Sequence, residues 1–321
     1  MNTNTSQAEL IDQLATIKVD LENEIGKVII GQKEVINQIL ISIFSNGHVL
    51  LVGVPGLAKT LLVNSVSKVL GLDFNRIQFT PDLMPADIIG NEIFNESKKF
   101  EFIPGPVFTN VLLADEINRT PPKTQAALLE SMQEKSVTYA GKNYELPKPF
   151  FVLATQNPVE QEGTYPLPEA QLDRFMFNIW VNYPSFQEEL DVVKQTTGNI
   201  SNEINPILSA DKIMQFQKLI RDIPVTDAVY EYAVKLCMST RPDTEFATEL
   251  TNKYLNWGAG PRASQYLILG AKTHAALNGK YSPDIEDVKA VALPVLRHRI
   301  LANYHADADG ITVDQIITKL L

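Results

Sequence analysis

The segment with the most specific chemistry reads Gly53-Val-Pro-Gly-Leu-Ala-Lys59-Thr60. It follows the strand-sized run 48–52 and precedes the helical run 61–70. Such a loop lets backbone N–H groups converge on phosphates, while its lysine reaches the β- and γ-phosphates and its hydroxyl ligates Mg²⁺. The alternative is an ordinary glycine-containing turn with a surface lysine. The predicted nucleotide-binding residues are Gly53, Val54, Pro55, Gly56, Leu57, Ala58, Lys59, Thr60 and Leu61.

One position departs from the pattern G-x-x-x-x-G-K-[ST], because Ala58 stands where the second glycine is expected. Alanine is unfavourable only where the backbone φ is positive, a conformation that glycine adopts freely. The interpretation as a phosphate-binding loop is therefore acceptable if the backbone at Ala58 has a helical, negative φ.

Two further apolar runs end in polar side chains. The run 110–114 leads into Asp115 and Glu116, and the run 150–155 leads into Asn157. Ligands of parallel sheets bind at the carboxyl ends of strands. We therefore expect Asp115 to hold Mg²⁺ through its water shell, Glu116 to polarise an attacking water, and Asn157 to hydrogen-bond that water or the γ-phosphate. The alternatives are a helix start with complementary charge for the acidic pair and an Asn-Pro turn for Asn157.

The elements that position these residues change character along the chain. Ser6 and Glu9 have capping-box spacing before an apolar stripe of helical period, and a second helix is expected over 35–43. Strands then alternate with helices to about residue 185, with β-hairpins expected at 93–103 and 137–146. The fold class predicted is α/β, a three-layer α/β/α parallel-sheet domain with two inserted hairpins over residues 1–184. An all-α domain follows over residues 185–321, beyond the linker that contains Pro184.

Composition narrows the classes of function. The 321 residues carry a formal charge of −10, which argues against a surface that coats nucleic acid, although a ring could still line its channel with basic residues. The single cysteine, Cys237, cannot form an internal disulfide, and no secretory signal is visible at the N-terminus. The apolar runs are far shorter than the roughly 18 residues of a membrane span. We expect a soluble, cytoplasmic protein without a membrane segment.

Taken together, the motifs resemble those of the MoxR family of AAA+ ATPases, whose helix-2-insert branch also holds magnesium chelatase motor subunits. The resemblance covers nearly the whole chain, and alanine at the position of Ala58 is usual in that family. The matching segments are 31–32, 53–60, 115–119, 154–158, 167–175 and 260–262.

The resemblance implies a P-loop NTPase domain followed by a helical lid, and a role for each motif. Asn157 would be the sensor-1 residue, Arg174 the arginine finger presented to the nucleotide of a neighbouring subunit, and Arg262 the sensor-2 residue that touches the γ-phosphate from the same chain. The two hairpins would be the helix-2 insert and the pre-sensor-1 insert. The residues implied to border the adenine are Ile30, Gly31 and Gln32.

The physical chemistry favours arginine at these positions, since a guanidinium offers several fixed donors to the charge that develops on a transferring phosphate. The alternatives are a pair with Asp173 or Glu169 for Arg174, and a solvated side chain for Arg262. Arg119 is a second candidate for a contact with the neighbouring subunit.

The expected function is that of a Mg²⁺-dependent ATPase with Lys59, Glu116, Asn157, Arg174 and Arg262 in the catalytic set. By resemblance it works as a homo-oligomeric ring, most simply a hexamer, that remodels, assembles or activates a protein partner, in some cases with a von Willebrand A domain protein. The alternatives are the motor subunit of a metal chelatase, a DNA-translocating motor, and a nucleotide-sensing scaffold without useful turnover.

Other conspicuous residues have plainer interpretations. Trp180 and Trp257 are expected to be packing residues. His298, within the basic run 297–299, is expected on a solvated helix face, with a contact to nucleotide or another anion as the alternative. The segment 98–100 is expected in an exposed turn, with a grip on substrate in a central pore as the alternative.

Overall fold

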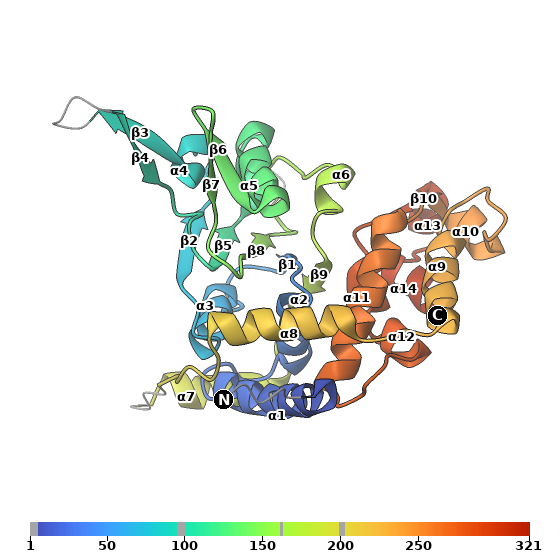
Figure 1. The fold of residues 1–321 in the computed structure, drawn as a ribbon. Coiled ribbons are helices and arrows are strands. Elements are labelled where there is room, and N and C mark those ends of the chain that lie inside the picture. Colours follow the sequence, from blue (N-terminus) through green and yellow to red (C-terminus); the bar gives the residue numbers. More distant parts are fainter. Residues whose placement is uncertain (1–5, 95–99, 161–162, 199–202) are drawn as a thin grey trace.

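A computed structural model describes residues 6–94, 100–160, 163–198 and 203–321. Its centre is a five-stranded parallel sheet in the order β2-β5-β8-β1-β9 (Figure 1). The fold class predicted from the sequence is confirmed. The strands are β1 (Val49–Val52), β2 (Phe74–Gln78), β5 (Val111–Asp115), β8 (Phe151–Gln156) and β9 (Phe177–Trp180).

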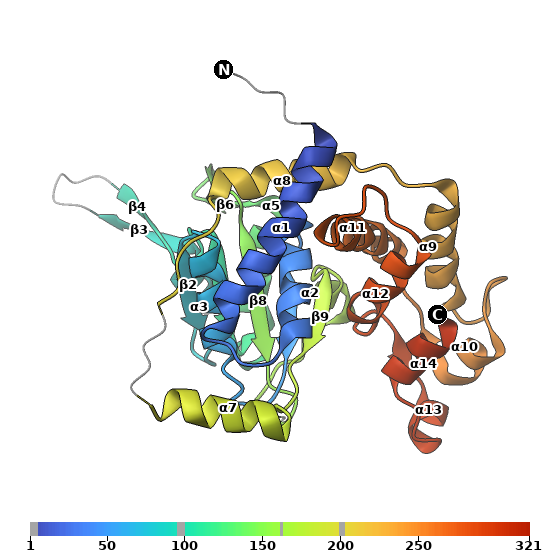
Figure 2. The ribbon, with the colours of Figure 1, turned by 90° about the horizontal axis from the view of Figure 1, so that it is seen from below.

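Both faces of the sheet are buried, as the continuous apolar character of its central strands requires. In β5, Val111 and Leu113 face one hydrophobic cluster, whereas Leu112 and Ala114 face another. The first cluster contains side chains of α1 (Gln7–Gly26), α2 (Lys33–Phe44) and α3 (Lys59–Val69), which lie side by side in Figure 2. The second contains side chains of α4 (Pro85–Ile89) and α5 (Pro122–Glu134).

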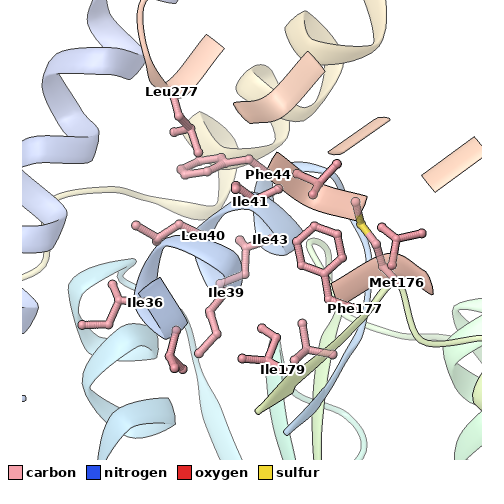
Figure 3. Close-up of a cluster of buried hydrophobic side chains, with 14 of the residues drawn as sticks. Ile36, Ile39, Leu40, Ile41, Ile43, Phe44, Met176, Phe177, Ile179 and Leu277 are labelled. Carbon is pink, nitrogen blue, oxygen red and sulfur yellow. The ribbon is translucent and has the colours of Figure 1, made fainter. Parts of the chain in front are cut away.

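The helix α2 connects the sheet to the helical part of the chain. Its side chains Ile39 and Ile43 lie above Phe177 and Ile179 of the edge strand β9, and Phe44 at its end lies near Leu277 (Figure 3). The preceding helix begins as predicted, because Ser6 and Glu9 form a reciprocal capping box.

Two antiparallel hairpins are inserted in the α/β framework, as predicted. β3 (Gly90–Phe94) pairs with β4 (Phe100–Pro104), and β6 (Ser136–Tyr139) pairs with β7 (Lys142–Glu145). The β3–β4 hairpin projects from the body of the molecule, and Phe100 is exposed on it (Figure 1). The rest of its predicted turn, 96–99, lies outside the described residues, so the interpretation of Lys98 and Lys99 stays a prediction.

Beyond Pro184 the regular structure of the described residues is helical except for one small sheet. That sheet pairs β10 (Leu255–Trp257) with β11 (Leu301–Ala302), so the prediction of purely helical structure was wrong at this point. A two-residue strand is too short to have a readable hydrophobic period. The helices are α7 (Phe186–Thr196), α8 (Ala210–Asp222), α9 (Asp227–Ser239), α10 (Glu249–Tyr254), α11 (Pro261–Leu277), α12 (Ile285–Leu296), α13 (Tyr304–Ala308) and α14 (Val313–Leu320).

Two expectations about individual side chains were also wrong. Trp180 and Trp257 are exposed, because each ends a short strand at the surface; the ring of Trp180 lies against the Arg297 guanidinium. The run 297–299 does not form a solvated face, since it follows α12 into the junction with the sheet domain, where Arg299 is buried and His298 is half-buried. No helix in the described part of the chain is long and apolar enough to cross a membrane.

Candidate functional site

The loop after β1 forms the floor of the site. β1 lies between β8 and β9, so the loop begins at the carboxyl end of an interior strand of the sheet. Lys59 begins α3, and its Nζ donates to the carbonyl oxygens of Gly53 (2.6 Å) and Val54 (2.8 Å). Partial burial lowers the pKa of the Lys59 ammonium, whereas the carboxylates of Asp115 and Glu116 oppose that shift.

The backbone at Ala58 differs from the prediction. Its φ is +53° and its ψ is 25°, so the residue adopts the left-handed conformation directly before the first residue of α3. The condition of a negative φ, under which alanine would be unstrained here, is therefore not met. An L-residue in this region carries roughly 1–2 kcal/mol of strain. The loop therefore holds Ala58 in a conformation that glycine would adopt more easily.

A cavity of about 430 Å³ opens above this loop, and we name it the P-loop cavity. It brings the predicted phosphate-binding residues together with the predicted polar residues at the ends of β5 and β8, although these come from three separate segments. Its lining consists of Pro55, Gly56, Leu57, Ala58, Lys59, Thr60, Leu61, Asp115, Glu116, Thr155 and Asn157. Gly53 and Val54 are outside this lining and contribute the carbonyl oxygens that Lys59 contacts.

Asp115 is buried and fixed from two sides. Thr155 donates its hydroxyl to Oδ1 over 2.6 Å. Arg76, on the edge strand β2, donates to Oδ2 from Nε (3.0 Å) and from Nη2 (2.7 Å). Register explains this contact, because Gln78 lies opposite Asp115 in the parallel pair and Arg76 shares its face two residues earlier.

Glu116 follows with a left-handed backbone, φ +58°. Its N–H donates to the Thr155 hydroxyl (2.8 Å), and its Oε2 accepts from Gln78 Nε2 (2.8 Å). The same oxygen lies 3.0 Å from Nε of Arg119, in the short helix η1 (Ile117–Arg119). The carboxylate is thus held at the mouth of the P-loop cavity by an amide and a guanidinium.

Asn157 is buried at the same edge. Its Oδ1 accepts from the Val159 N–H (3.1 Å), as in an Asn-Pro turn, and its Nδ2 donates to Glu160 (3.2 Å). Glu160 also pairs with Arg119, and this guanidinium holds the pKa of the Glu160 carboxyl below its usual range. Two hydrogen bonds and an ion pair thus connect Asn157 to Glu116 through the side chains of Glu160 and Arg119.

Several residues of this network were not assigned from the sequence. Thr155 and Gln156 were part of the strand and its end, and Arg76, Gln78 and Glu160 carried no motif recognised there. Polar residues two apart on a β-strand, such as Arg76 and Gln78, share a face, and this is the signal that points toward them.

A second cavity, of about 380 Å³, adjoins the first and is called the α7 cavity here. It shares the lining residues Pro55 to Ala58 and Leu61 with the P-loop cavity. Ile30 and Gln32, which the resemblance implied to border the adenine, line this cavity together with residues of α7. Gly31 has φ +68°, which favours glycine, and a Cβ there would also have to displace the Glu188 side chain. The remaining lining residues are Val28, Ile29, Tyr183, Pro184, Glu189, Val192, Gln195 and Thr196.

The structure does not bring Arg174 or Arg262 into either cavity of the same chain. Arg174 follows α6 (Glu169–Leu172), donates to the Leu129 carbonyl (2.8 Å) and borders a separate hollow on α5. Arg262, at the start of α11, pairs with Asp173 (3.0 Å between Nη1 and Oδ2), which also binds the buried Arg299.

The donor set fits Mg²⁺ delivered with a nucleotide. In the described part of the chain, no cluster of three or more acidic, histidine or cysteine side chains could hold a metal alone. Mg²⁺ keeps several waters and takes one or two protein oxygens together with substrate phosphates. Thr60 and Asp115, which both line the P-loop cavity, supply such oxygens beside the lysine expected to bind phosphate.

Comparison with family models gives two matches. Residues 48–177 match the ATPase family associated with various cellular activities (AAA), and residues 247–320 match the AAA lid domain. The first range contains the P-loop cavity, and the second begins just before α10.

Known proteins similar to this chain share most of its length. It is 43% identical to the chaperone MoxR1 of Mycobacterium tuberculosis, covering 93% of this chain and 79% of that protein. It is 32% identical to the protein MoxR of Methylorubrum extorquens, covering 87% and 86% respectively. A solved structure of a putative ATPase from Cytophaga hutchinsonii superposes with a TM-score of 0.90 at 46% identity, covering 97% of this chain and 95% of that chain.

Proposed function

The chain belongs to the MoxR family of AAA+ ATPases, and we propose that it hydrolyses ATP with Mg²⁺ and uses the reaction to remodel, assemble or activate a protein partner. The observation that carries the hydrolytic part is the P-loop cavity, where Lys59 and Thr60 meet Asp115, Glu116 and Asn157. A scaffold that only senses nucleotide would not need the carboxylate of Glu116 beside the phosphate-binding loop.

Each residue has a defined task in this proposal. Loop N–H groups and Lys59 bind the phosphates, while Thr60 and Asp115 hold Mg²⁺, which balances the charge that develops on the phosphoryl oxygens. Glu116 accepts a hydrogen bond from the attacking water and orients it toward the γ-phosphate. Asn157 donates to that phosphate or to the water once its Nδ2 no longer donates to Glu160. The adenine would occupy the α7 cavity, between Ile30 and α7.

The experiment that tests hydrolysis replaces the carboxylate and keeps its shape. Glu116→Gln should bind a fluorescent ATP analogue as the unaltered protein does and lose ATP turnover by about 10²-fold or more, because a general base is removed. Lys59→Ala should lose nucleotide binding itself. Glu145→Gln on the exposed hairpin strand β7 is the matched control. Normal turnover by Glu116→Gln would refute the site assignment.

We propose further that the chain works as a ring, with six subunits as the expected number, in which Arg174 contacts the nucleotide of the neighbour. The separation of Arg174 from the cavities of its own chain supports this role. Mixing Arg174→Ala with Glu116→Gln should restore turnover, since some interfaces then combine an intact arginine with an intact cavity. Absence of rescue in mixed rings verified by native mass spectrometry would contradict it. Arg262, which pairs with Asp173, is proposed to contact the γ-phosphate of the nucleotide bound to its own chain.

The partner and the division of labour between domains remain proposals as well. We propose a lid over residues 185–321; in support, the α7 cavity is lined from both sides of Pro184. Hydrolysis would change the angle between lid and sheet domain and move the hairpins. Affinity capture with Glu116→Gln and ATP should retain the client protein, for which a von Willebrand A domain protein is one candidate. We place the chain in the cytoplasm, where its free, buried Cys237 stays reduced.

A further inference from the structure

Arg76 contacts the residue that we expect to hold Mg²⁺. Its guanidinium makes two hydrogen bonds to Oδ2 of Asp115, at 2.7 and 3.0 Å, and donates from Nη2 to Oε1 of Gln78 at 2.5 Å. Gln78 in turn donates to Glu116. A single arginine on the edge strand thus reaches the metal ligand directly and the catalytic carboxylate through one amide.

The position of Arg76 separates it from the residues that hold the phosphates. Among the described residues it is not part of the lining of the P-loop cavity, and it approaches Asp115 from the β2 side. Its side chain is 45% exposed, at the edge of the sheet, whereas the side chain of Asp115 is 11% exposed. The positive charge therefore stands behind the carboxylate that would face the metal.

We propose that Arg76 is a positioning residue whose charge opposes Mg²⁺ at Asp115 and so weakens the favourable coupling between Mg²⁺ and nucleotide at this site. This inference rests on the proposed metal site. A cation beside a shared carboxylate repels a second cation, and the repulsion is moderated but not abolished where solvent reaches the pair. Arg76 and Arg119 offset the negative charge of Asp115 and Glu116. The phosphates of a bound nucleotide supply the further negative charge that is needed to hold Mg²⁺ there.

Thr155 allows this charge effect to be separated from a loss of geometry. Its buried hydroxyl holds Oδ1 of Asp115 at 2.6 Å and also accepts from the Glu116 N–H. Asp115 ends the buried strand β5, which is hydrogen-bonded to β2 on one side and to β8 on the other. When Arg76 is replaced, the carboxylate therefore keeps one fixed oxygen and a fixed backbone, and the main change is the loss of a positive charge.

The test measures how strongly Mg²⁺ and nucleotide favour each other's binding. A fluorescent, non-hydrolysable ATP analogue is titrated into the full chain with EDTA and then with Mg²⁺, and the ratio of the two dissociation constants is the metal coupling. In Arg76→Gln the coupling should rise by about fivefold, the size expected for a half-exposed charge. Arg76→Lys, which keeps the charge, should stay near the unaltered protein, as should Lys235→Gln, which removes an exposed ion pair on α9.

Two comparisons decide the outcome. A folded Arg76→Gln protein whose coupling is unchanged or lower would overturn the inference, and Arg76→Met, which keeps the aliphatic stem, repeats the test if Arg76→Gln does not fold. Failure of both variants to fold would also overturn it, since the side chain would then be structural. Asp115→Asn separates the two proposals. If the coupling is unchanged in Asp115→Asn, the metal site itself is refuted. If the coupling is lost in Asp115→Asn but does not rise in Arg76→Gln, only the role of Arg76 is refuted.

Discussion

Two regions of this molecule pair arginines with carboxylates, and the arginines are exposed in one region and buried in the other. At the P-loop cavity, Arg76 and Arg119 contact Asp115 and Glu116 with side chains that are 45% and 37% exposed. At the junction between α6 and α12, Arg299 contacts Asp173 with a side chain only 2% exposed. The first pair can rotate into solvent when a ligand competes for the carboxylates, whereas the second cannot leave without unpairing buried groups.

The backbone differs between the same two regions. Gln32, Ala58 and Glu116 all have positive φ, and all line the adjoining P-loop and α7 cavities. Around Arg299 the guanidinium satisfies a set of backbone carbonyl oxygens, and no non-glycine residue with positive φ lies in the segment 167–182 as far as it is described. We therefore expect the strained cavities to change on ligand binding, while the hydrogen bonds of the Arg299 guanidinium hold the junction fixed.

The largest expected effect comes from breaking the junction. Arg299 donates to the Asp173 carboxylate (2.7 Å) and to the carbonyls of Asp173, Phe175 and Met176 (3.0, 2.6 and 3.2 Å). Arg299→Met should lower the free energy of unfolding by about 3 kcal/mol or more, because these buried acceptors lose their donor. Chemical denaturation monitored by circular dichroism measures the change.

The matched control is Arg262→Met, which removes the other partner of Asp173. Its side chain is 41% exposed, so the expected cost is below about 1 kcal/mol. Equal destabilisation by the two variants would remove the distinction between exposed and buried arginines on which the comparison depends.

Acid should weaken the junction next. His298 is half-buried, its Nε2 lies 3.1 Å from the Phe175 carbonyl oxygen, and its buried Nδ1 has no hydrogen-bond partner among the described residues. Burial, followed by the charge of Arg299, lowers the pKa of this imidazole well below its usual value. Below about pH 6.5 the unfolded chain therefore binds a proton at this imidazole, whereas the folded chain does not. The free energy of unfolding then falls by up to about 1.4 kcal/mol for each unit by which the pH is lowered.

The measurement is the free energy of unfolding between pH 6.5 and 5. His298→Gln, which can donate to the same carbonyl and does not titrate, should show a shallower slope by about one proton. His305→Gln, on the exposed helix α13, is the control and should keep the original slope. His48, whose pKa burial lowers to about 4, contributes equally to all three proteins. An unchanged slope in His298→Gln would show that the junction takes up this proton without cost.

Much of the cavity region could be predicted from the sequence because its signals are local. The loop, the acidic pair and Asn157 each follow an apolar strand, and parallel pairing alone brings strand ends to one edge. The junction could not be predicted in this way. Arg299 and Asp173 are separated by more than a hundred residues, and the basic run at 297–299 has the same letters whether it faces solvent or a set of carbonyls.

The contacts of Arg76 were missed for a related reason. They depend on the register between β2 and β5, which places Gln78 opposite Asp115, and no turn connects the two strands to fix that register in advance. The roles of Arg174 and Arg262 came from the resemblance, and a single subunit does not test them.

The smallest expected effect relieves the strain at the cavity. Ala58 has φ +53°, where glycine is favoured. Ala58→Gly should raise the free energy of unfolding by about 0.5–1 kcal/mol, since the relief of left-handed strain outweighs the added freedom of the unfolded chain. Thermal and chemical denaturation both measure the gain.

Ala140→Gly is the matched control, because Ala140 has φ +47° in the turn before Gly141 and lies far along the chain from the loop. Both variants should be stabilised alike if the gain comes from the backbone alone. Only Ala58→Gly should also change the affinity for nucleotide, because Ala58 lines the P-loop cavity and a glycine gives the loop more conformational freedom. A stabilised Ala140→Gly beside an unstabilised Ala58→Gly would mean that the loop carries no strain, and the contrast between a strained cavity and a relaxed junction would then rest on the arginines alone.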